Sequence, residues 1–272
     1  MSKPKKVLIY TALSIGALIM LFPFVWMLLS SLKTAAEVNT TPPTFFPARA
    51  TWENYVYAFK KAPFLIYFRN SVIVTVVCVA CTQFSTILAA FAFSRLKFPG
   101  RDILFSLLLS MMMIPFEMLI ITNYQTIVDW GLVDTLAALV IPFTSSVFYT
   151  YILRNFFLSI PDSLYWSARV DGTSNWQYLW RIMVPMAKPA LVTIGILNAI
   201  ACWNSFLWTV MATNKTEVRT LPFGLYAFMS SSGIRYERLM AAATIVVLPM
   251  ILLFICFRKQ IVTGVSRGGL KG

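Results

Sequence analysis

The sequence contains no histidine. Without an imidazole, the chain cannot build a Ser-His-Asp or Cys-His catalytic arrangement, or a metal site that uses histidine ligands. Its four cysteines add little, because Cys78 and Cys81 form a lone C-x-x-C inside an apolar run without a second pair of ligands. We interpret them as small apolar packing residues. The sequence therefore predicts neither catalytic residues nor a metal site.

Charged residues are scarce as well. Only 12% of the 272 residues are charged, whereas a soluble globular domain carries about 25%. So few charges cannot cover a surface that faces water, but a surface that faces lipid does not need them. The net charge of +13 does not indicate nucleic-acid binding, because the basic residues are scattered between apolar runs and form no stripe. The composition therefore places the chain among the membrane proteins.

Six apolar segments have about the 20 residues that a helix needs to cross a bilayer. They occupy residues 7–32, 71–93, 103–122, 136–153, 190–212 and 239–257. The first is longer than the apolar core of a signal peptide, so we interpret it as a membrane anchor. No repeat or soluble domain boundary is visible, so we expect residues 1–272 to form one domain. The predicted fold is an all-α integral membrane protein with six transmembrane helices.

The orientation follows from the Lys and Arg residues between the spans. If the N-terminus is inside, the inside segments are residues 1–7, 94–102, 154–188 and 258–272. They hold 14 of the 23 basic residues, although the outside segments contain more residues in total. We therefore expect both termini to be cytoplasmic.

The cytoplasmic segment around residues 158–188 carries dense helix signals. Asp162 follows a proline and favours a helix start, because its carboxylate faces the positive end of the helix dipole. Gly172 can adopt the left-handed conformation that ends a helix. Ser174 precedes Gln177 by three residues, which is the capping-box spacing that opens a second helix. The pattern predicts a helix-turn-helix.

Two interpretations of this hairpin remain open. It could lie on the membrane surface with Trp166, Trp176 and Trp180 among the lipid headgroups. Alternatively, it could stand away from the bilayer as a rigid knob on which a partner protein pushes.

The same segment resembles the EAA loop of bacterial ABC-importer permeases. Residues 166–172 read Trp-Ser-Ala-Arg-Val-Asp-Gly, and Ile182 and Pro185 follow the glycine at the family spacing. The family has Glu and Ala where this chain has Trp166 and Ser167, so we expect docking there to rest on aromatic packing and shape. The resemblance implies that one set of residues couples to an ATPase: Trp166, Ser167, Ala168, Arg169, Asp171, Gly172, Ile182 and Pro185.

Five further segments, in the same order along the chain, resemble the carbohydrate branch of this family, the maltose-type second permease subunit. They are TWENY at 51–55, FSRLKFPGR at 93–101, WNSFLW at 203–208, RTLP at 219–222 and the basic, glycine-rich tail at 268–272.

The resemblance implies a type I ABC-importer permease in a bacterial cytoplasmic membrane. Its partners would be a second permease subunit in a heterodimer, two ATPase subunits and an extracytoplasmic sugar-binding protein, with lipid around it. The chain has no phosphate-binding G-x-x-x-x-G-K-[ST] loop, so ATP and Mg²⁺ would be bound by the ATPase subunits. Segment 213–238 would reach the binding protein, unless it is an ordinary solvated loop.

A sugar path needs amides and aromatic faces rather than charges. The residues of this kind in or near the predicted spans are Gln83, Glu117, Asn123, Tyr124, Asn198, Trp203, Asn204 and Trp208. Each has an ordinary alternative, because amides often join helices and tryptophans often anchor helix ends. Glu117 is the strongest candidate, since an ionisable group among apolar residues normally faces a cavity.

Two other functions compete with an importer subunit. In a self-sufficient secondary transporter or channel, Glu117 would carry the coupling ion. A membrane-embedded enzyme is the third possibility, but the chain has few groups that could perform chemistry. Uptake by this chain alone, driven by a pH gradient, would favour the secondary transporter.

Overall fold

The computed structural model describes residues 3–229 and 234–268, with side chains described as far as residue 258. Throughout those ranges every regular element is a helix. The chain divides into two compact units. The first comprises Met1–Leu65 and Leu221–Leu252, and the second comprises Ile66–Thr220 and Leu253–Gly272. The expected all-α membrane fold is confirmed.

Three helices are long and apolar enough to span a membrane by themselves: α1 (Lys3–Ser31), α4 (Phe64–Arg95) and α14 (Tyr236–Gly268). They correspond to the first, second and sixth predicted spans. α4 begins before the predicted residue 71, because the polar Asn70 is accommodated inside the helix. Its buried amide donates to the carbonyl oxygens of Glu217 and Arg219 at 2.7 and 3.0 Å.

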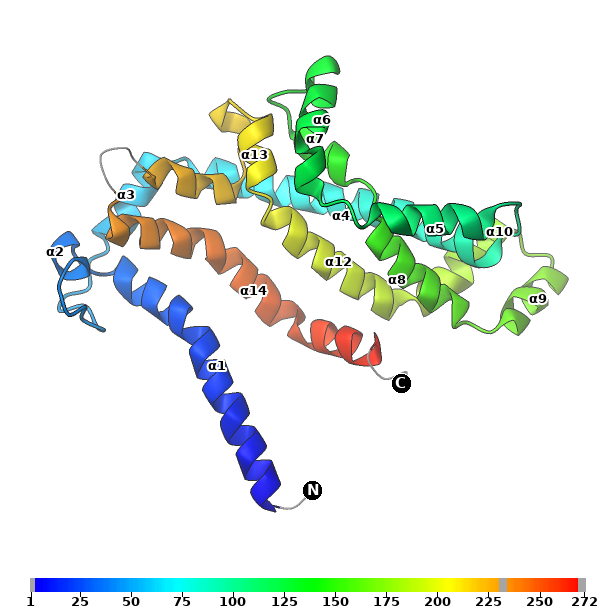
Figure 1. The fold of residues 1–272 in the computed structure, drawn as a ribbon, viewed down its shortest axis with the longest axis horizontal. Coiled ribbons are helices and arrows are strands. Elements are labelled where there is room, and N and C mark those ends of the chain that lie inside the picture. The colour runs from blue at the N-terminus through cyan, green and yellow to red at the C-terminus, as the bar shows by residue number, and fades with distance from the viewer. Residues whose placement is uncertain (1–2, 230–233, 269–272) are drawn as a thin grey trace. The chain divides into compact units, whose positions relative to one another are not determined.

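The third predicted span is broken rather than straight. α5 (Arg101–Met111) and α6 (Phe116–Asp129) meet at 97° (Figure 1). Pro115 lies at the break with an extended ψ of 144°. Its ring nitrogen has no proton to donate, so the helix cannot continue through it. The prediction of one continuous helix over 103–122 is therefore wrong.

The fourth span is also bent. α7 (Leu136–Val140) runs into the short helix η1 (Ile141–Phe143), and α8 (Val147–Leu158) follows at 47°. Ser146 is extended and caps α8, because its hydroxyl accepts the N–H of Tyr149 at 3.3 Å. With each bent pair counted as one span, the described residues contain up to six spans.

The fifth span departs most from the prediction. α12 (Lys188–Trp203) ends where a helix to residue 212 was expected, and α13 (Leu207–Ala212) begins anew. Asn204 and Ser205 lie in the break, and short polar side chains of this kind compete with the helix for backbone partners. Residues Asn175–Met186 form a further apolar helical stretch at 77° to α12. The break takes Asn204 out of the regular helix.

The first unit contains three short helices: α2 (Ala35–Val38), α3 (Glu53–Lys61) and η4 (Leu221–Phe228). Asn54 of α3 donates to the carbonyl oxygens of Ser31 and Lys33 at 2.9 and 2.8 Å. Gly224 lies directly against Phe64, where a Cβ would come within 2.5 Å of the ring. The segments between the spans are therefore folded and carry specific contacts.

The second unit is built around two buried clusters. The first joins α4, α8 and α12 to the helices of residues 162–186 through Leu153, Phe157, Met183 and other apolar residues. The second joins α4, α6, α7 and α13 and includes Cys78, as expected for a packing residue. The remaining helices of this unit are α9 (Asp162–Val170), α10 (Asn175–Tyr178), the π-helix η2 (Leu179–Met183), α11 (Val184–Met186) and η3 (Thr216–Val218).

A single carboxylate joins two loops of the second unit. Asp134, which has a positive φ of 62°, accepts the backbone N–H groups of Asn214 and Lys215, the latter at 2.8 Å. These hydrogen bonds, led by the one from Lys215, lower the pKa of Asp134 below its usual value. A lowered pKa stabilises the folded state above the ordinary aspartate pKa, and the stabilisation is lost as the pH falls through the lowered value.

We therefore predict that acidification releases segment 214–215 from this loop. Amide hydrogen exchange, corrected for its intrinsic pH dependence, should show protection of Asn214 and Lys215 falling at acidic pH. In Asp134→Asn, the protection should be weaker at neutral pH and insensitive to acid. Equal, pH-dependent protection in both proteins would contradict this role.

Candidate functional site

The predicted helix-turn-helix at residues 158–188 is present, and its turn is fixed by backbone hydrogen bonds. Gly172 has a φ of +77°. The N–H of Thr173 donates to the carbonyl oxygen of Ala168 at 3.0 Å, and the N–H of Gly172 donates to that of Arg169 at 3.1 Å. These two bonds form a Schellman motif, which satisfies carbonyl groups at the end of α9. The predicted helix stop at Gly172 is confirmed.

The second helix begins as the spacing predicts. Ser174 accepts the N–H of Gln177 at 3.2 Å, and the Gln177 side chain accepts the N–H of Ser174 at 3.0 Å. A side-chain bond of 2.9 Å from Tyr165 to Asn175 joins α9 to α10. The chain then continues through the π-helix η2, a rare conformation that is frequent at functional sites. The hairpin is thus a rigid element rather than a flexible loop.

Arg95, at the end of α4, holds the start of this hairpin. Its guanidinium donates to the carbonyl oxygens of Phe157 and Ile160 at 2.8 and 2.6 Å and pairs with the Asp162 carboxylate. The Arg95 side chain is only 4% exposed, while that of Asp162 is 78% exposed. Arg95 therefore ties the end of α8, the carbonyl group of Ile160 just beyond it and the first turn of α9 to α4.

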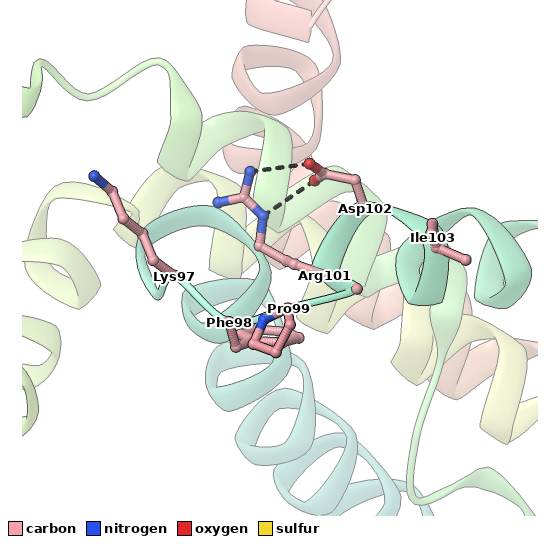
Figure 2. Close-up of a pocket in the computed structure, with 7 residues that line it drawn as sticks. Lys97, Phe98, Pro99, Arg101, Asp102 and Ile103 are labelled. Atoms are coloured by element: carbon pink, nitrogen blue, oxygen red, sulfur yellow. Dashed lines mark hydrogen bonds and ion pairs between the residues drawn. The ribbon is translucent and has the colours of Figure 1, made fainter.

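The short loop between α4 and α5 lies beside this contact and lines an open hollow of about 690 Å³. In it, Arg101 forms two bonds with Asp102, and Lys97 points away from both (Figure 2). Arg154 of α8 also approaches Asp102 at 3.7 Å and covers the ring of Phe105 at 4.2 Å. These contacts fasten α5 to α8.

The hairpin presents an apolar face without cover from the described residues. Val170 is 88% exposed, and Trp166 and Trp176 are 57% and 58% exposed. Ser167, Arg169, Asp171, Gly172 and Pro185 are also exposed. Ala168 is buried and Ile182 is half-buried, and both pack into the first cluster. The predicted coupling residues thus divide into an exposed face and a packed base.

Four of the eight predicted path residues line one cavity of about 390 Å³. Glu117 lies in the first turn of α6, Asn198 lies near the end of α12, and Asn204 and Trp208 flank the break before α13. Glu117 is exposed, whereas the Asn198 side chain is buried and its Nδ2 has no hydrogen-bond partner among the described residues. The cavity therefore combines a carboxylate, two amides and an aromatic side chain.

The other four predicted path residues lie outside this cavity's lining. Gln83 donates to the carbonyl oxygen of Leu191 at 3.2 Å and so joins α4 to α12. Trp203 is buried against Phe68, and Tyr124 packs against the second cluster. Asn123 lies beside it on α6 and is half-buried.

Several residues at these sites were not predicted. Arg95 occurs in the FSRLKFPGR segment, but the sequence does not show which carbonyl groups it binds. Ser205 and Phe206 line the cavity because the fifth span breaks there, and a hydropathy pattern does not show that break. Trp208 has a structural bond as well, since its indole N–H donates to the carbonyl oxygen of Ala138 at 2.9 Å.

Bent apolar spans, a capped helix-turn-helix with an exposed apolar face and a largely apolar cavity that contains a carboxylate and two amides define an integral membrane transport component. The chain belongs to the family of binding-protein-dependent transport system inner membrane components, whose model matches residues 3–267.

The chain is similar to several transport system permease proteins. The chain is 30% identical over 259 residues to the arabinooligosaccharides transport system permease protein AraQ of Halalkalibacterium halodurans, covering 94% of this chain and 93% of that protein. It is 32% identical over 254 residues to the sulfoquinovosyl glycerol transport system permease protein SmoH of Agrobacterium fabrum, covering 93% and 89%.

The fold is similar to that in a crystal structure of a bacterial ABC transporter involved in the import of the acidic polysaccharide alginate. The TM-score is 0.81 and the identity is 25%, over 95% of this chain and 98% of that chain. Together with the family match, this similarity confirms the resemblance to ABC-importer permeases.

Proposed function

We propose that this chain is a permease subunit of an ATP-driven, binding-protein-dependent importer of an oligosaccharide or a related sugar. The observation that carries the proposal is the capped hairpin around Gly172. It is held rigidly at its base and exposes Val170, Trp166 and Trp176. The transport systems named for the relatives, which handle arabinooligosaccharides, sulfoquinovosyl glycerol and alginate, support a carbohydrate cargo.

In this proposal the chain spans a bacterial cytoplasmic membrane several times, with both termini in the cytoplasm. It pairs with a second permease subunit and contributes half of the translocation path. Two ATPase subunits bind ATP and Mg²⁺ below the hairpin, and a sugar-binding protein delivers cargo from outside. The chain itself performs no catalysis, takes no cofactor and binds no nucleic acid.

The hairpin would carry force between these partners. Closure of the ATPase subunits on ATP would move the exposed face of α9, and its packed base would pass that movement to α4, α8 and α12. Coupling requires an element with two states whose equilibrium is shifted by the partners at both of its ends. In this proposal the bundle of spans is the element that has two states. With Trp166 in place of a glutamate, docking rests on apolar packing and shape, with Arg169 and Asp171 as the nearest charges.

The proposal is tested by reconstituting the chain in liposomes with its partner permease, ATPase subunits and binding protein. Labelled oligosaccharide should enter the liposomes only when ATP is supplied on the ATPase side and the binding protein on the other. Omitting either should reduce uptake to the leak of protein-free liposomes. Uptake by this chain alone under a pH gradient would instead support the secondary transporter.

A further inference from the structure

The cavity of about 390 Å³ is lined from both sides by residues at breaks in two spans. The break at Pro115 puts the first turn of α6 on one side of it, and the break at residues 204–206 puts the end of α12 and the start of α13 on the other. Its volume is within the range of small-molecule sites. Two interrupted helices that meet within a membrane are a typical setting for a transport site.

The described lining of the cavity carries negative charge and no positive charge. Glu117 is its only charged residue, and no Lys or Arg is among the described residues that line it. The remaining polar groups are the amides of Asn198 and Asn204 and the hydroxyl of Ser205. Neutral hydroxyl groups can donate to the carboxylate and accept from the amides, whereas an anion would meet a carboxylate that no basic residue of the described lining balances.

The aromatic residues add faces on which an apolar side of a sugar ring can rest. Phe116 lies 5.0 Å from Phe143 and 6.0 Å from Trp208, measured between ring centroids. The indole N–H of Trp208 is already bonded to Ala138, so this side chain offers only its ring. The Nδ2 group of Asn198 is buried without a partner among the described residues, which costs free energy unless a ligand supplies an acceptor.

We propose that this cavity is a cargo subsite on this subunit, and that Glu117 makes it selective for uncharged sugars over anionic ones. The inference rests on the proposed function, because the cavity can bind cargo only if this subunit forms part of the translocation path. The relatives do not decide the point, since arabinooligosaccharides are uncharged and alginate is acidic.

Cys202 lines the same cavity and is half-buried, so it can report the local charge. In the assembled transporter, its alkylation is measured by peptide-resolved mass spectrometry with a cationic and an anionic methanethiosulfonate reagent. Relative to a free cysteine peptide, the cationic reagent should be favoured by about fivefold or more. Glu117→Gln should abolish that preference. The matched control is Asp129→Asn, which removes a carboxylate at the far end of α6 and should leave the preference unchanged.

The second arm uses sugars as protecting ligands. Maltotriose should slow Cys202 alkylation in the wild type and in Glu117→Gln, whereas a trisaccharide of galacturonic acid should protect only the variant. Unchanged reagent preference in Glu117→Gln, protection of the wild type by the acidic sugar, or an unreactive Cys202 would overturn the proposal. ATP-driven uptake, measured on the same preparation, separates these outcomes, because its absence contradicts the proposed function rather than the subsite.

Discussion

Gly172→Val is expected to leave the protein inserted and assembled but to reduce ATP-driven uptake by about tenfold or more. At φ +77°, a β-branched residue is strained by about 1–3 kcal/mol. A Cβ at this position would meet no atom within 4 Å, so the cost is conformational and not steric. The turn relieves the strain by leaving the left-handed conformation, which breaks the Schellman bonds of Gly172 and Thr173 and reorients α9.

Two matched variants separate this effect from general damage. Gly172→Asn should retain most of the uptake, because asparagine tolerates the left-handed region. Gly131→Val introduces similar strain at φ +66°, also in open space, but in the loop after α6. It should leave the stimulation of the ATPase by loaded binding protein intact. Normal stimulation in Gly172→Val would contradict a coupling role for the turn.

Arg95→Gln is expected to destabilise the second unit by about 2–5 kcal/mol and to abolish coupling. The guanidinium is buried and donates hydrogen bonds to the carbonyl oxygens of Phe157 and Ile160. These two residues lie at the end of α8 and just beyond it. A buried acceptor that loses its donor costs about 1–3 kcal/mol. A shorter side chain cannot reach both carbonyls and Asp162, so the start of α9 should detach from α4. Thermal unfolding in detergent and uptake in liposomes measure the two effects.

The control for Arg95 is Asp162→Asn. Because the Asp162 side chain is largely exposed, its ion pair with Arg95 is screened by water and contributes little. This variant should lower the unfolding temperature only slightly. A loss as large as that of Arg95→Gln would show that the ion pair, and not the carbonyl contacts, holds the hairpin.

The hairpin could be predicted because its determinants are local. Ser174 and Gln177 are three residues apart, and Gly172 needs only its own backbone conformation, so both signals are visible in the sequence. The long apolar helices are also local features. Coupling by the hairpin remains a prediction.

The breaks in the spans were not predicted, because average hydropathy stays high across them. Pro115 lies inside the predicted span 103–122, and Asn204 lies inside the predicted span 190–212. Both residues interrupt the backbone hydrogen bonding rather than the apolar character of the segment. The cavity was therefore missed as a unit, since it brings together Glu117 and Asn198 from distant parts of the chain.

The candidate path residues were selected from the sequence by residue type and by position in a span. This selection finds polar and aromatic side chains in spans, but it does not show which face of a helix each side chain occupies. Gln83 bonds to a neighbouring helix, and Trp208 combines a cavity position with a structural bond to Ala138. Orientation around a helix depends on packing partners, and these are set by contacts far apart in the sequence.

We predict that the exposed face of the hairpin docks onto an ATPase subunit and does not lie on the membrane surface. A photo-crosslinking amino acid at Val170, the most exposed large apolar residue of the hairpin, tests it in the assembled transporter. We expect a crosslink to the ATPase subunit that changes in yield when ATP is added. The same group at Trp52, which is exposed in the predicted outer segment, should give none. Crosslinks from Val170 to lipid alone would contradict the docking role.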